Sequence, residues 1–107
     1  MSRRPLVTVE EEVITASAVQ SAVAVPKQYQ VILYNDDYTP MNFVVEVIMR
    51  FFHVTEDVAG RMMMQVHQKG QAVCGVFTHD VAKTIVELVN EYARLNEYPL
   101  LCGMHAI

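Results

Sequence analysis

The segment that most restricts the fold of this chain is the run YQVILY at residues 29–34. Its Tyr29, Val31 and Leu33 alternate with a glutamine, an isoleucine and a tyrosine, which is the two-residue period of a β-strand. Such a strand suits a sheet that is covered mainly on one face. We therefore expect the folded domain to begin close to this strand.

The next segment, residues 39–53, has the pattern of an amphipathic helix. Thr39 can cap the unpaired amides of a helix start, and Pro40 suits the first helical position because it lacks an N–H group. Polar residues that are four, four and three positions apart then form a solvated stripe along an otherwise apolar helix. This stripe consists of Asn42, Glu46, Arg50 and His53.

Two more helices and two more strands are expected beyond this helix. Thr55 can cap a second helix, which has acidic residues in its first turn and ends at Gly70. The apolar run at residues 71–78 has strand length, and Thr78 can cap a third helix that Pro99 stops. Residues 100–107 form a last short strand. One face of the third helix is expected to carry Val81, Ile85, Leu88 and Tyr92.

The element order β-α-α-β-α-β predicts an α+β two-layer sandwich, with a three-stranded antiparallel sheet packed by three helices. A chain of 107 residues supports one such domain. Residues 1–26 contain no aromatic residue and no glycine, and they follow no period for long. We expect a flexible extension there, with a short amphipathic helix around residues 9–20 as the alternative, and a domain at residues 27–107.

Composition excludes several classes of function. Twelve acidic and eight basic residues give a net charge of −4 without any long basic cluster, which argues against a nucleic-acid-binding surface. No run is apolar enough for a signal peptide or a membrane span. Cys74 and Cys102 lack the spacing of a zinc site or a disulfide framework. A reducing cytoplasm is therefore the expected location, and no cofactor is expected.

Asn35, Asp36 and Asp37 follow the first strand, and two interpretations apply to them. Asn and Asp are common in turns because their side chains accept hydrogen bonds from nearby backbone. Three neighbouring side chains with oxygen acceptors also suit the capture of a cationic donor such as an ammonium group. The residues alone leave both interpretations open.

Residues 62–67, MMMQVH, form the second notable cluster. Successive helical residues lie about 100° apart, so three consecutive methionines cannot all face one core, and at least one should line a groove. Filling irregular gaps in the core is the alternative use of methionine. His67 lies one turn from Met63 and is either a structural residue or a ligand.

Catalysis and metal binding have weak support. Cys74 and His67 could be imagined as nucleophile and base, but burial of Cys74 in an apolar strand would raise the pKa of its thiol, and no oxyanion-forming glycine turn adjoins it. The spacing of the histidines is not that of a metal site. These residues are His53, His67, His79 and His105. The sequence therefore does not predict an enzyme.

Four blocks in this order, YNDDYTPMNFV, MMMQVHQKG, CGVFTHDVA and NEYPLLC, resemble the ClpS family of protease adaptors over residues 27 to about 103. The resemblance implies an adaptor that performs no chemistry. It would bind proteins whose N-terminal residue is Leu, Phe, Tyr or Trp and deliver them to the ClpA unfoldase of the ClpA-ClpP protease. It also implies a fold like the ribosomal stalk protein C-terminal domain. A stalk-like interaction module without recognition of N-terminal residues is the alternative function.

The resemblance also implies roles for individual residues. Asn35, Asp36 and His67 would bind the α-amino group of the substrate, with Asp37 as a supporting neighbour. The pocket for the first side chain would consist of Thr39, Met41, Val44, Val47, Met62, Met63 and Leu100. Met41 would exclude β-branched first residues. Contact with the N-terminal domain of ClpA would involve Asp80, Tyr38 and Ile85, the last at a position where the family commonly has a lysine. The N-terminal extension would engage the unfoldase.

Overall fold

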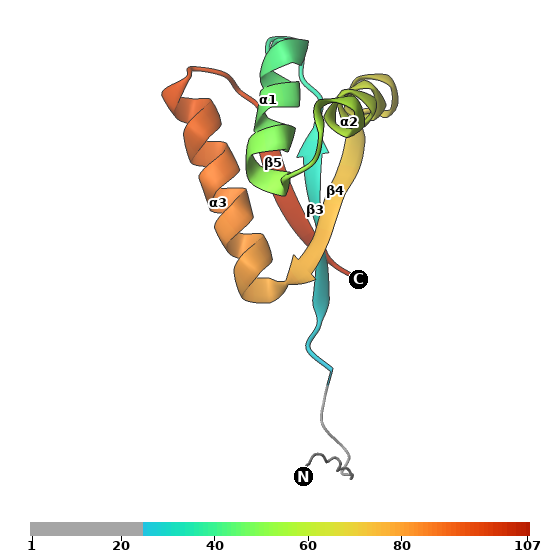
Figure 1. The fold of residues 1–107 in the computed structure, drawn as a ribbon. Coiled ribbons are helices and arrows are strands. Elements are labelled where there is room, and N and C mark those ends of the chain that lie inside the picture. Colours follow the sequence, from blue (N-terminus) through green and yellow to red (C-terminus); the bar gives the residue numbers. More distant parts are fainter. Residues whose placement is uncertain (1–24) are drawn as a thin grey trace, which may run out of the picture.

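The computed structural model of the protein describes residues 25–107, so the predicted extension at residues 1–26 lies almost entirely outside the described part. Six elements follow one another in the predicted order β-α-α-β-α-β (Figure 1). They are β3 (Gln28–Tyr34), α1 (Met41–Phe52), α2 (Glu56–Lys69), β4 (Gln71–Thr78), α3 (His79–Leu95) and β5 (Leu101–Ala106). Within residues 25–107, no helix is long and apolar enough to cross a membrane.

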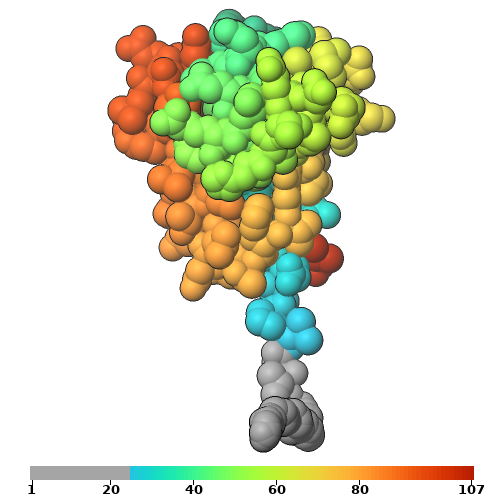
Figure 2. All heavy atoms as spheres, viewed as in Figure 1, coloured from blue at the N-terminus to red at the C-terminus, as the bar shows by residue number. Residues whose placement is uncertain are grey.

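The first strand of the domain becomes the centre of the sheet. The strand order is β4-β3-β5, and both pairings of β3 are antiparallel. Atoms of α1, α2 and α3 cover much of the sheet in the view of Figure 2, and the helices lie on one of its faces. This arrangement confirms the predicted two-layer sandwich.

The core lies between the sheet and the helices. Val31 and Leu33 of β3 are fully buried there, as the alternation of the first strand predicts. Each helix adds fully or almost fully buried side chains to the same cluster, among them Val47, Ile48, Ala59, Val66, Ala82 and Val89. The core therefore joins the central strand to all three helices.

A β-bulge allows strand β4 to direct extra side chains at the helices. The pairing passes from Val31 opposite Gly75 to Ile32 opposite Val73, so Cys74 is the additional residue. Ala72, Cys74 and, beyond the bulge, Phe77 all pack against the core cluster. A Cβ atom on Gly75 would lie 2.6 Å from the Phe77 ring. Any larger residue at this position would therefore force the Phe77 ring to move.

The other face of the sheet carries no helix among the described residues, and we call it the open face. Tyr34 lies across it, because its hydroxyl is hydrogen-bonded to His105 Nε2 at 2.8 Å and its ring closely approaches Gly103. Ile32, on the same face of the sheet, is only 4% exposed. Strand pairing and alternation place on this face Gln28, Gln30, Ile32, Tyr34, Gln71, Val73, Val76, Thr78, Leu101, Gly103 and His105.

The helix starts differ in how well they follow the predicted caps. Thr55 caps α2 by accepting a hydrogen bond from Val58 N at 3.4 Å, and Gly70 ends this helix with φ of 88°, as predicted. Thr78 takes the N-cap position of α3 but makes no capping hydrogen bond. The expectation for α1 was wrong, because Pro40 is its N-cap and Thr39 lies outside the helix, where its hydroxyl binds Asp36 instead.

The predicted apolar face of α3 packs against the core only in part, through Ile85 and Tyr92. Small residues, Ala82 and Ala93, bring α3 close to the sheet and are fully buried together with Val89. Val81 and Leu88 remain about half exposed, at 48% and 50%. The stripe that contains them turns toward α1, where the Tyr92 ring stacks on Phe43 at 5.6 Å.

A side chain of α3 blocks the outer edge of the sheet. The amide of Asn90 donates to Cys102 O at 3.0 Å and accepts from Cys102 N at 2.8 Å. These two bonds satisfy backbone groups of edge strand β5 that another strand could otherwise pair. Asn90 therefore substitutes for a neighbouring strand and also anchors α3 to the sheet.

We expect Asn90→Ala to lower the free energy of unfolding by about 1–3 kcal/mol, because it leaves a partly buried N–H and C=O of β5 unpaired. Urea denaturation followed by circular dichroism measures this change. Asn96→Ala is the matched control, since Asn96 hydrogen-bonds only to its own helix at an exposed end, at Tyr92 O. The control should change stability by less than about 0.5 kcal/mol. Equal effects would show that the Asn90 bonds to β5 add nothing.

Candidate functional site

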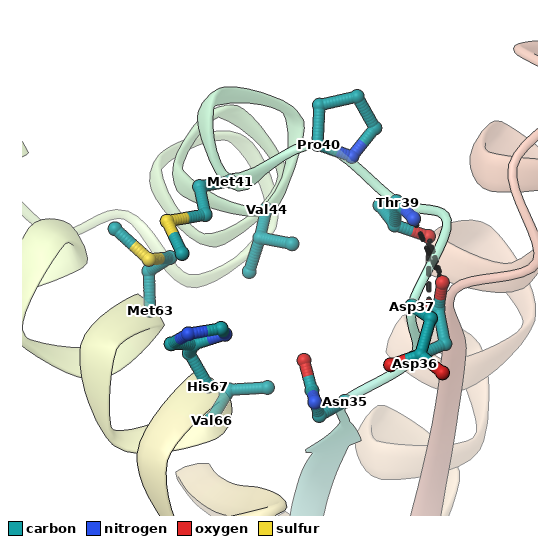
Figure 3. Close-up of a pocket in the computed structure, with 10 residues that line it drawn as sticks. All are labelled: Asn35, Asp36, Asp37, Thr39, Pro40, Met41, Val44, Met63, Val66 and His67. Atoms are coloured by element: carbon teal, nitrogen blue, oxygen red, sulfur yellow. Dashed lines mark hydrogen bonds between the residues drawn. The ribbon is translucent and has the colours of Figure 1, made fainter.

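A hollow of about 310 Å³ opens where strand β3 ends. The loop at residues 35–40, the first turn of α1 and the second half of α2 surround it (Figure 3). Its wall is apolar on the side of the helices and polar on the side of the loop. The lining residues are Asn35, Asp36, Asp37, Thr39, Pro40, Met41, Val44, Met63, Val66 and His67.

The carboxylate of Asp36 holds the loop in shape. Its Oδ1 accepts hydrogen bonds from the backbone N–H groups of Tyr38 and Thr39 at 2.8 and 2.7 Å. The hydroxyl of Thr39 donates to the other oxygen, Oδ2, at 2.7 Å. The turn interpretation therefore applies to Asp36, which fixes the direction in which the chain enters α1.

Asp37 has a different environment. It is exposed and lines the hollow, and its carboxylate makes no hydrogen bond or ion pair with another residue in the range 25–107. An ionised carboxylate can accept several hydrogen bonds from a ligand. The two acids thus differ. The carboxylate of Asp36 accepts hydrogen bonds within the turn, whereas that of Asp37 lines the hollow without a hydrogen-bond partner in the described part of the chain.

Asn35 and His67 come together because β3 and α2 end side by side. The backbone N–H of Asn35 donates to Gly70 O at 2.9 Å, which ties the start of the loop to the C-cap of α2. His67 lies in the last turn of that helix. Both side chains reach the hollow in Figure 3. The side chains of Asn35 and His67, which can both form hydrogen bonds, therefore line the same hollow as the carboxylates.

The three consecutive methionines of α2 point in three directions. Met63 lines the hollow, Met62 packs against the core, and Met64 is 38% exposed. This confirms that at least one of them lines a groove. Met41 from α1 lines the same hollow and is 45% exposed. Flexible thioether side chains from two helices thus form part of the wall, and such side chains adapt to different apolar ligands.

The lining differs from the expected pocket at several positions. Of the residues expected around the pocket, Thr39, Met41, Val44 and Met63 line the hollow, whereas Val47, Met62 and Leu100 pack in or against the core and are not part of its lining. Pro40 and Val66 line it but were not expected. Helical spacing could have indicated Val66, because Met63, Val66 and His67 follow at i, i+3 and i+4.

The cysteines do not belong to this hollow. Burial raises the pKa of the Cys74 thiol to about 11 and that of Cys102 to about 12, and both thiols are free. A buried thiol with a raised pKa is a poor nucleophile at neutral pH. The expectation that burial would raise the pKa of Cys74 is confirmed.

A second hollow, of about 450 Å³, lies between the end of α1 and the exposed stripe of α3. We call it the α1-α3 groove. Ile85 lines it and Asp80, whose side chain is 99% exposed, stands one turn and a half earlier on α3. Tyr38, 79% exposed, belongs to the loop at the other end of β3 (Figure 1). The groove is lined by Arg50, Phe51, Phe52, His53, Phe77, Val81, Ile85 and Leu88.

Comparison with known proteins connects this architecture with a class of protease adaptors. Residues 24–103 match the family described as "ATP-dependent Clp protease adaptor protein ClpS". The chain belongs to this family. The family consists of adaptors of the Clp protease, so its members work with that protease and its substrates.

Individual relatives agree with the assignment. The ClpS adapter of Salmonella arizonae is 54% identical over 85 residues, which cover 79% of this chain and 80% of the relative. The ClpS adapter of Salmonella paratyphi B is 51% identical over 91 residues, covering 85% and 86%. A solved structure, Agrobacterium tumefaciens ClpS2 bound to L-phenylalaninamide, is 36% identical with a TM-score of 0.76, covering 78% of this chain and all of that one.

Proposed function

We propose that this adaptor binds proteins through a free α-amino group and a bulky hydrophobic N-terminal residue, and delivers them to the ClpA-ClpP protease. The hollow beside α1 and α2 carries the proposal, because it combines an apolar wall with acceptors for an amine. The ligand of the similar ClpS2 protein, L-phenylalaninamide, has this chemistry, namely a free amine beside a large apolar side chain. We place the protein in the cytoplasm, where its free cysteines stay reduced.

The acceptors at the rim match the needs of an ammonium group, which has three N–H bonds to satisfy. The Asn35 carbonyl and a neutral ring nitrogen of His67 accept two of them. The carboxylate charge comes from Asp36 and Asp37. We assign the direct contact to Asp37, because its carboxylate has no partner within residues 25–107, whereas both oxygens of Asp36 already accept hydrogen bonds in the turn. Asp36 adds its charge from one residue away and holds the loop.

The expected affinity follows from two contributions. Charge-assisted hydrogen bonds contribute about 1.5–3 kcal/mol each. Burial of a Leu or Phe side chain against Met41, Val44, Met63 and Val66 adds about 1.5–3 kcal/mol. Two or three such hydrogen bonds and one buried side chain reach micromolar affinity, which corresponds to about 8 kcal/mol.

The amine site predicts distinct effects for the two acids. Asp37→Asn should weaken binding of a peptide with N-terminal Leu at least about tenfold without a loss of stability. Asp36→Asn should lower both affinity and melting temperature, because Asn keeps one acceptor of the turn but loses the charge and the second acceptor. Fluorescence anisotropy and thermal denaturation measure the two quantities.

An N-acetylated form of the same peptide is the matched control for this experiment. Acetylation removes the charge and two N–H bonds, so the wild-type protein should not bind it detectably. Equal affinity for the free and acetylated peptides would contradict the amine site and would favour a stalk-like interaction module. If Asp36→Asn weakens peptide binding and Asp37→Asn does not, Asp36 is the residue that contacts the α-amino group directly.

Met41 is expected to restrict the shape of the first side chain. It lies in the first turn of α1 at the mouth of the hollow and is 45% exposed. Val and Ile carry two heavy atoms on Cβ and cannot rotate away from this wall as Leu can. Met41→Ala should therefore improve binding of peptides with N-terminal Ile and Val roughly 10- to 200-fold, while Leu and Phe peptides keep most of their affinity.

Titration of the four peptides against both proteins measures this specificity. Met64→Ala is the matched control, because Met64 is 38% exposed on α2 and does not line the hollow. It should leave all four affinities unchanged. Continued exclusion of Ile and Val by a folded Met41→Ala protein that still binds Leu would assign the restriction to another residue.

We assign the contact with the N-terminal domain of ClpA to the surface around Asp80 and Ile85. Ile85 lines the α1-α3 groove beside Val81 and Leu88, so the contact has an apolar part next to the charge of Asp80. Tyr38 belongs to the loop at the other end of β3, near the proposed peptide site, so it would contact the unfoldase separately.

Leu88→Asp should weaken binding of the isolated ClpA N-terminal domain at least about tenfold, because it introduces a charge into an apolar contact. Leu88 is half exposed, so the substitution spares the core. Peptide affinity should not change. Val76→Asp, on the open face, is the control and should bind the domain normally. Isothermal titration calorimetry separates these outcomes, and unchanged binding by Leu88→Asp would place the contact elsewhere.

A further inference from the structure

The methionines of this chain differ in how easily an oxidant can reach them. Six of the seven lie within residues 25–107, and three of these are partly buried and pack against the core, namely Met62, Met63 and Met104. The other three are more accessible, with Met41 45%, Met49 38% and Met64 38% exposed. Because oxidation of a thioether to a sulfoxide requires access to the sulfur, these three are the expected points of attack.

The two cysteines do not compete for the oxidant. Cys74 and Cys102 are only 8% and 2% exposed, and burial raises the pKa of their thiols to about 11 and about 12. Peroxides react with the thiolate, which is scarce at neutral pH for thiols of this kind. Oxidation by a peroxide is therefore directed to the exposed thioethers.

Of the three exposed methionines, Met41 alone lines the hollow that we propose as the peptide site. In Figure 3 its side chain extends from α1 toward Met63 of α2, on the apolar side of the hollow. Met49 lies about two turns further along α1 and, like Met64, is absent from the lining. The most exposed methionine of the described chain thus stands where an apolar ligand would bind.

We propose that Met41 is a site of reversible oxidation by hydroperoxides and that its oxidation lowers the affinity of the adaptor for apolar N-terminal residues. In this step the O–O bond of hydrogen peroxide breaks and one oxygen atom forms an S=O bond with the Met41 sulfur. The sulfur is oxidised by two electrons, and the peroxide is reduced to water. The effect on affinity rests on the proposed function, whereas the oxidation itself does not.

The loss of affinity follows from the polarity of the sulfoxide. Its oxygen is a hydrogen-bond acceptor, and the neighbouring side chains of Val44 and Met63 have no donor for it. Water can satisfy this oxygen while the hollow is empty, because Met41 is exposed at the mouth. A Leu or Phe side chain in the hollow would displace that water and leave the acceptor unpaired. We expect the affinity to fall roughly 5- to 150-fold.

The position of Met41 also keeps the oxidation from disturbing the fold and allows it to be reversed. Met41 belongs neither to the buried core cluster nor to the side chains packed against it. A polar group at this position therefore leaves the core intact, whereas oxidation of Met62 or Met63 would place one against it. The exposure that admits a peroxide also admits methionine sulfoxide reductases, which restore the thioether.

A bound substrate should protect Met41. The first side chain of a peptide in the hollow would cover this residue, but it would not cover Met49 or Met64, which do not line the hollow. Saturation with peptide should thus slow oxidation of Met41 at least about fivefold and leave the other two rates unchanged. Substrate binding and oxidation of Met41 would then exclude each other.

Peptide mapping by mass spectrometry of the full chain, treated with hydrogen peroxide in the absence and presence of an N-terminal Leu peptide, tests the site and its protection. The peptide should contain no methionine or cysteine. Fluorescence anisotropy then measures its affinity before oxidation, after removal of the peroxide, and after treatment with the reductases. We expect Met41 to be oxidised, the affinity to fall as stated and the reductases to restore it. The melting temperature should not change.

Met41→Leu and Met64→Leu are the matched variants, because leucine has nearly the same volume as methionine and is not oxidised. Each variant is compared with itself before and after peroxide, so a change in its starting affinity does not matter. Met64→Leu should lose affinity on oxidation as the wild type does. Met41→Leu should keep its affinity after the same treatment.

Three outcomes would overturn the proposal. The first is a Met41 that stays reduced while Met49 and Met64 are oxidised. The second is an equal loss of affinity in oxidised Met41→Leu, which would assign the effect to another residue. The third is a melting temperature that falls with the affinity, which would attribute the loss to unfolding. Absence of binding by the reduced wild type would instead contradict the proposed function, and the mapping would still decide whether Met41 is the oxidation site.

Discussion

The burial of one face of strand β3 is the constraint on which the structure depends. Val31 and Leu33 are fully buried, and they belong to one core cluster with residues of helices that come both before and after β4 in the chain. Because β3 also pairs with both other strands, its position sets the register of the sheet and the place of every loop. The hollow that we propose as the peptide site lies at one end of this strand, and the helix that carries Asp80 begins beside the other.

The sheet is protected at its edge by means that also serve the fold. Asn90 pairs with the backbone of β5, and a bulge at Cys74 interrupts the regular edge of β4. Both devices discourage edge-to-edge addition of another strand. The hollow at the loop, the α1-α3 groove and the open face use different residues.

The loop after β3 combines a turn with part of the hollow. Asp36 accepts hydrogen bonds from Tyr38 and Thr39, which fixes the entry into α1 and with it the position of Met41. Asp37 lines the hollow together with Asn35 and His67. The turn interpretation therefore applies to Asp36, and the cation site is our proposal for Asp37.

Local pattern determined most of the fold: the alternation in residues 29–34, the Thr55 cap, the Gly70 stop and the order of the six elements. These features depend on residues near one another in sequence, where period and capping chemistry act. The hydrophobic stripe of α3 was also evident from the sequence. The sequence did not show which residues of α3 are buried, namely Ala82 and Val89, while Val81 and Leu88 remain about half exposed. The turn formed by Asp36 depends on residues two and three positions further along, which local sequence can indicate. The exclusion of Val47, Met62 and Leu100 from the hollow was decided by the tertiary structure. Contacts between distant segments, such as Asn35 with Gly70, set the depth and the lining of a site, and no local period encodes them.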